Sequence, residues 1–136
     1  APATLRESVV ITTVTSPERT TVLQHTNVEP GQLREALEVS LRKAGYLSAS
    51  PAAARALLAV ALVSLKQAGL GPTVTSHIRY TLTSRASGAM LVDEVMVAEC
   101  SEYAFLSWER VQHSTECSVR RNIEAFLQKT LLLPAN

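Results

Sequence analysis

The sequence has few aromatic residues, no excess of either charge and no long apolar run. Thirteen basic and twelve acidic residues give a net charge of +1, so no basic surface for nucleic acid or an anionic membrane is predicted. One Trp, three Tyr and two Phe are too few for the stacking platforms that bind single-stranded nucleic acid. No apolar segment approaches the roughly 20 residues needed to cross a bilayer. These absences argue against nucleic-acid partners and against a membrane-spanning helix.

Cysteine is also scarce, with only Cys100 and Cys117 present. Two thiols at this spacing do not match a zinc site. The pattern places Cys100 at the end of a strand and Cys117 on the outer face of a helix. Because a disulfide needs closely apposed Cβ atoms, we expect both thiols to be unpaired.

No constellation of catalytic or metal-binding residues is evident. Asp93 is the only aspartate, and a Ser-His-Asp triad would need it beside His25, His77 or His113 and an activated serine. The sequence contains no G-x-S-x-G nucleophile elbow. The histidines stand apart, without the short spacings that prepare a metal site. We therefore predict a chain that is not an enzyme and has no metal site and no cofactor.

The clearest pattern that is present is a strand-turn-strand sequence over residues 72–99. Residues 74–82 alternate with a period of two, the period of a strand with one solvent-facing side: apart from Ser76, one side is apolar, and the other side is polar. A Ser- and Gly-containing break at residues 84–88 is followed by a second run at 89–98, which predicts an antiparallel hairpin. The polar side carries Thr73, Thr75, His77, Arg79 and Thr81.

The remaining segments are assigned from their own periodicity. β-Branched residues 8–15 predict a first strand, and residues 16–28 predict a long loop. An apolar stripe through Leu33, Leu37 and Leu41 predicts a helix that Gly45 ends. A second helix is predicted over residues 107–131, with an inner stripe of Trp108, Val111, Thr115, Val119, Ile123, Phe126 and Leu127. Residues 1–7 form an expected flexible arm, and residues 8–134 a single domain.

The segment at residues 50–67 is ambiguous. Ser50 as an N-cap, Pro51 at the first helical position and the many alanines favour a helix. Residues 57–65 are apolar on both alternating sides, which equally fits a strand in the middle of a sheet. Periodicity alone does not separate these two alternatives.

Taken together, several segments resemble a family of small, largely uncharacterised proteobacterial envelope lipoproteins. They are VVITTVTS, QLREALEVSLRKAGYL, the stretch from LLAVALVSLKQ through the hairpin, and SVRRNIEAFLQKTL. In that family the segment equivalent to residues 57–66 is a strand. The resemblance thus implies an α+β fold of order β-α-β-β-β-α, with a single mixed four-stranded sheet and two helices on one face.

The resemblance also implies a periplasmic protein that is anchored to the outer membrane in its full-length precursor. A lipoprotein precursor carries a signal segment and a lipidated cysteine, and neither precedes Cys100. Either the anchor belongs to a longer precursor, or the envelope localisation does not hold.

Two functions are compatible with this sequence. The first is a non-enzymatic interaction or assembly module of the cell envelope, which docks an envelope protein through its sheet. The second is a carrier or sensor of a small lipid or glycan, held in a cleft under the loop at residues 16–28. The candidate binding residues are Thr73, Thr75, His77, Arg79, Thr81 and, from the loop, His25.

Overall fold

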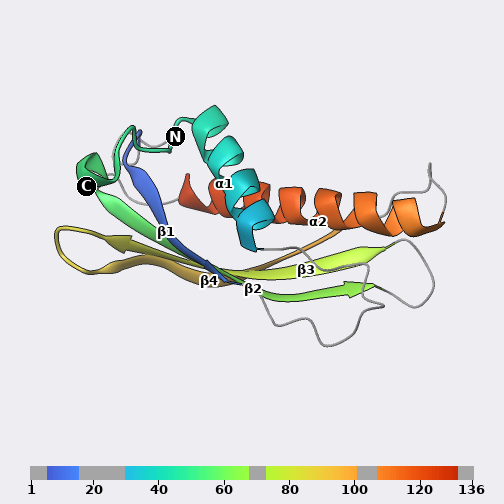
Figure 1. The fold of residues 1–136 in the computed structure, drawn as a ribbon. Helices are drawn as coiled ribbons and strands as arrows, with labels where there is room; N and C mark the ends of the chain where they lie inside the picture. Colours follow the sequence, from blue (N-terminus) through green and yellow to red (C-terminus); the bar gives the residue numbers. More distant parts are fainter. Residues whose placement is uncertain (1–5, 16–29, 68–72, 101–106, 132–136) are drawn as a thin grey trace.

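The computed structural model describes residues 6–15, 30–67, 73–100 and 107–131. It has the order β-α-β-β-β-α, apart from one short 3-10 turn, and a single mixed sheet of four strands. Both helices lie on the same side of the sheet (Figure 1). The predicted fold class is therefore confirmed.

The strands follow chain order across the sheet, β1-β2-β3-β4. β1 (Val9–Thr15) pairs parallel with β2 (Ala56–Gln67), and α1 lies between them in the chain. β2 pairs antiparallel with β3 (Val74–Ser84), which pairs antiparallel with β4 (Met90–Cys100). The predicted hairpin is thus confirmed. β1 and β4 form the two edges.

Helix α1 (Pro30–Ala44) begins at a proline, which suits a first turn because its missing N–H needs no intrahelical partner. Leu33, Leu37 and Leu41 are fully buried, as the apolar stripe predicts. Gly45 has a φ of +82°, a left-handed conformation that glycine adopts without steric cost, and it ends the helix.

The ambiguous segment at residues 50–67 divides into two parts. Its helix-favouring start forms only one 3-10 turn, η1 (Pro51–Ala53). From Ala56 onward the chain is strand β2, which is paired on both sides, with β1 and with β3. The strand predicted over residues 57–65 is confirmed, because pairing along two neighbours outweighs the modest helix propensity of alanine.

A single core fills the space between the sheet and the helices. Ile78 and Tyr80 of β3 are buried in one cluster with side chains from both helices. Tyr80 stacks on Phe126, with the ring centroids 4.2 Å apart and the planes within 5°. One core is thus shared by Leu37, Leu41, Ile123, Phe126, Ile78 and Tyr80.

Helix α2 (Ser107–Thr130) differs from the prediction at its cysteine. Cys117 forms a disulfide with Cys100 at the end of β4, with the Cα atoms 5.8 Å apart. The expectation of unpaired thiols is wrong, because this side of α2 faces β4 and not solvent. The stripe residues Val119, Ile123 and Phe126 are buried as predicted, whereas Trp108, Val111 and Thr115 lie outside the described side chains.

Polar side chains also hold α2 against the hairpin. Asn122 is fully buried; its Nδ2 donates to the Met96 carbonyl at 2.7 Å, and its Oδ1 accepts from the Tyr80 hydroxyl at 2.9 Å. One turn earlier, the Ser118 hydroxyl donates to the Ala98 carbonyl at 2.8 Å. Burial raises the pKa of Tyr80, which keeps the phenol protonated as a donor. Among the described residues, no buried side-chain nitrogen or oxygen lacks a partner.

Candidate functional site

Both helices cover one face of the sheet, and no described element covers the opposite face, which we call the open face (Figure 1). The polar alternation of β3 lies on this face: Ile78, Tyr80 and Leu82 are buried under the helices, so the intervening residues point the other way. The open face of β3 therefore carries one line of polar side chains, which we call the polar line: Thr75, His77, Arg79 and Thr81. Thr73 immediately precedes the strand. The structure brings these five predicted binding residues together.

Arg79, the charged residue of the polar line, is paired with a carboxylate of the same sheet. The Arg79 guanidinium donates two hydrogen bonds of 2.9 Å to the two carboxylate oxygens of Asp93 on β4. The Thr81 hydroxyl donates a third, at 3.2 Å. The hydrogen bonds from Arg79 hold the pKa of Asp93 below its ordinary value, and the same pairing raises the pKa of Arg79. Asp93 thus acts as a fixed acceptor within the sheet, and the face carries little net charge at this point.

His77 also has a neighbour on the sheet. Its Nδ1 lies 3.1 Å from the Ser64 hydroxyl on β2, which is the residue paired with it across the strands. A Ser-His contact is part of a hydrolytic triad, but Asp93 is bound by Arg79 and Thr81 instead. The geometry therefore gives His77 a role in ordering the polar line.

Apolar side chains flank the polar line on both sides. Val95 and Val97 on β4 lie directly opposite Arg79 and His77, and their exposed fractions are 47% and 57%. On the other side Val63, at a bulge in β2, is 50% exposed. Exposed apolar side chains that lie close together can form part of a protein contact surface. The sequence analysis did not identify these valines, because the second run of the hairpin is apolar on both alternating sides.

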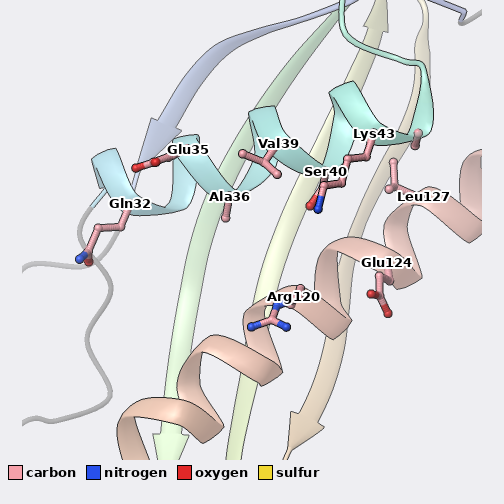
Figure 2. Close-up of a pocket in the computed structure, with 10 residues that line it drawn as sticks. Gln32, Glu35, Ala36, Val39, Ser40, Lys43, Arg120, Glu124 and Leu127 are labelled. Carbon is pink, nitrogen blue, oxygen red and sulfur yellow. The ribbon is translucent and has the colours of Figure 1, made fainter.

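A second surface feature, which the sequence analysis did not predict, lies in the helix layer. A groove of about 710 Å³ runs between α1 and α2. Figure 2 shows its lining, which combines apolar side chains with two acidic and two basic groups. The lining residues are Gln32, Glu35, Ala36, Val39, Ser40, Lys43, Ala44, Arg120, Glu124 and Leu127. Only the packing of two distant helices creates this groove, so no local pattern could have found it.

Other predicted features lie outside the described residues or form no site. His25 and the loop at residues 16–28 lie outside the described part of the chain. The side chain of His113 is also outside it. Within the described ranges, no three His, Cys, Asp or Glu side chains come together as a possible metal site. Neither described helix is long and apolar enough to span a membrane.

Comparison with known proteins finds similarity in structure and not in sequence. No family model and no curated protein matches the chain. A Xanthomonas campestris protein of family DUF330 superposes with a TM-score of 0.70 at 11% identity, covering 92% of this chain and 83% of that one. A hypothetical protein from Chlamydia trachomatis gives a TM-score of 0.60 at 14% identity, with coverages of 90% and 95%.

A candidate lipoprotein from Caulobacter crescentus gives a TM-score of 0.54 at 15% identity, and the match covers 88% of this chain and 85% of that one. Identities this low establish a common fold and nothing about activity. The chain therefore shares its fold, over about nine-tenths of its length, with small bacterial proteins that include a candidate lipoprotein.

Proposed function

We propose that this protein is a non-enzymatic interaction module of the bacterial cell envelope, which docks an envelope protein through the open side of its sheet. The observation that carries the proposal is the exposure of Val63, Val95 and Val97 around a polar line whose charges are already paired. Because Arg79 and Asp93 keep each other as partners when water leaves, covering this surface leaves neither charge unpaired.

The disulfide supports a location outside the cytoplasm. Cys100 and Cys117 are bonded, and disulfides persist in oxidising compartments such as the bacterial periplasm. The candidate lipoprotein among the structural neighbours agrees with this location. We propose that the protein is periplasmic and is held at the outer membrane by a lipid anchor of the full-length precursor. Incorporation of labelled palmitate into the product of the complete gene tests the anchor.

Position-specific cross-linking tests the docking function. A photoreactive residue is introduced at Val63 or Val97 on the open face, and at Val39 on α1 as a matched position with 39% exposure. The protein is exported to the periplasm and irradiated in cells. We expect the same protein adduct from Val63 and Val97 and none from Val39. Adducts from Val39 alone would contradict docking through the sheet.

The groove between α1 and α2 favours the second function, carriage of a small lipid or glycan. Its volume of about 710 Å³ lies within the range of ligand sites, and Val39 and Leu127 give it an apolar part. Mass spectrometry of lipids extracted from the protein purified from envelopes tests this function. A stoichiometric lipid that is lost in Val39→Lys, but not in Val63→Lys, would favour carriage over docking.

A further inference from the structure

The two edges of the sheet are protected to different degrees. At β1, which has seven residues, the Arg34 guanidinium donates to the carbonyls of Ile11 and Thr12 at 3.3 and 3.5 Å. A parallel bridge between Val9 and Leu47 covers the start of this edge. A bulge within β1 further interrupts its pairing. Bulges and capped carbonyls are the devices by which proteins prevent strand addition.

Strand β4 has a bulge at Leu91 near its start, and from Val92 to Cys100 its pairing with β3 is regular. It has eleven residues, and among the described elements none lies beyond it in the sheet. Three α2 side chains donate to β4 carbonyls: Asn122 to Met96, Ser118 to Ala98 and, near the strand's end, Arg121 to Glu99 at 3.1 Å. Val95 and Val97 lie exposed in the middle of the strand. A long edge strand with exposed β-branched residues is a template for pairing with another chain.

Helix α2 adds a charged rim above this edge. Arg121, Ala125 and Lys129 are spaced four residues apart and share one face of the helix. Contacts at both ends place this face over β4: Arg121 binds the Glu99 carbonyl, and the Lys129 ammonium lies 3.1 Å from a Glu94 carboxylate oxygen. The rim thus carries Arg121 and Lys129 with a small residue between them. Lys129 is paired with Glu94, but both side chains are nearly half exposed, and such a surface pair is weak enough for a second carboxylate to share the ammonium.

We infer that β4 accepts an extended segment of the partner protein, and that this segment has acidic side chains that pair with Arg121 and Lys129. The inference rests on the proposed docking function. These two residues lie about 12 Å apart along the helix, at a rise of about 1.5 Å per residue. A strand rises about 3.3 Å per residue, so the two acids should be about four positions apart on the partner. Its alternate residues face Val95 and Val97 and are apolar or β-branched.

A second copy of this chain fits the same edge less well. In β4, Glu94 is the one acidic residue on the helix-facing side, since Asp93 and Glu99 alternate to the open face. Self-pairing would therefore offer one carboxylate to two cations. The charge of the rim favours a different strand with two acids.

The test uses the capped peptide Thr-Glu-Val-Ser-Val-Glu-Thr and a control peptide with lysine in place of both glutamates. Binding to the intact protein is followed by titration calorimetry and by amide hydrogen exchange. We expect saturable binding of the glutamate peptide, at least about tenfold tighter than the lysine peptide. New exchange protection should appear at β4 and not at β1, because strand addition pairs the backbone of the edge.

Matched variants locate the binding. Val95→Lys with Val97→Lys should abolish it, because edge lysines block strand addition, whereas Val39→Lys on α1, at a side chain that is 39% exposed, should retain it. Arg121→Glu should weaken binding about tenfold, whereas Arg120→Glu, whose side chain lines the groove, should not. Circular dichroism confirms that each variant is folded.

Equal affinity for both peptides, or full binding by the valine double variant, would overturn the inference. So would self-association that is lost in that variant, since a second copy would then occupy the edge. The absence of saturable peptide binding would also overturn it. None of these results removes the proposed docking function, which the cross-link from Val63 on β2 tests separately.

Discussion

The two faces of the sheet satisfy their polar groups in different ways. On the covered face, the Tyr80 hydroxyl donates to Asn122 of α2 and the Ser118 hydroxyl of α2 donates to the Ala98 carbonyl, so the polar groups join two layers. On the open face, Arg79 bonds to Asp93 and His77 contacts Ser64, so the polar groups join neighbouring strands within one layer. Polar contacts on the covered face thus determine where the helix sits, whereas those on the open face leave a flat surface available to a partner.

The largest expected effect comes from the covered face. Replacing Phe126 with Ala removes the ring stacked on Tyr80 and should lower the free energy of unfolding by about 3 to 5 kcal/mol. Urea unfolding followed by circular dichroism measures this loss. Leu131→Ala, at a side chain that is 52% exposed, is the control and should cost little. A loss below about 0.5 kcal/mol for Phe126→Ala would contradict the assigned helix face.

The disulfide should contribute the next largest effect. Cys100 and Cys117 are 17 residues apart, and closing a loop of this length stabilises a fold by about 3 kcal/mol. We expect the double replacement by Ser to lower the unfolding free energy by this amount. Unfolding of the wild type should respond to a reducing agent, and that of the double variant should not. Equal sensitivity of both proteins to the reductant would refute the bond.

The buried polar contacts of α2 should have an intermediate effect. Asn122→Ala leaves the Tyr80 hydroxyl without its acceptor and the Met96 carbonyl without this donor, which should cost about 1 to 3 kcal/mol. Gln128→Ala, on the exposed side of the same helix, is the matched control. An Asn122→Ala variant as stable as this control would show that the contacts do not hold α2 in place.

The smallest effect is expected on the open face. The pKa of Asp93 is lowered in the folded state, mainly by hydrogen bonds from Arg79. Its contribution to stability is therefore present above the unfolded value of about 4 and is lost as the pH falls through the lower folded pKa. Asp93→Asn should reduce the difference in stability between about pH 6 and about pH 3. An unchanged acid dependence would argue against the ion pair in solution.

Some of this fold follows from sequence periodicity alone. The alternation along β3 correctly separates Tyr80 from Arg79, and the stripe of α1 correctly identifies Leu37 as buried. Each of these features depends on the geometry of a single element, which repeats every two or 3.6 residues. The line of polar residues on the open face could therefore be predicted without a structure.

Other features depend on contacts between distant segments. Periodicity does not decide whether residues 57–65 form a helix or a strand, and the family resemblance favours a strand. Pairing with both β1 and β3 explains why the strand forms. The disulfide was missed because the side of α2 that faces β4 depends on how the helix packs. The exposed β4 edge, its basic rim on α2 and the groove between the helices have the same origin. A sequence pattern specifies the faces of one element, whereas only the packing of elements decides which faces meet and which remain exposed.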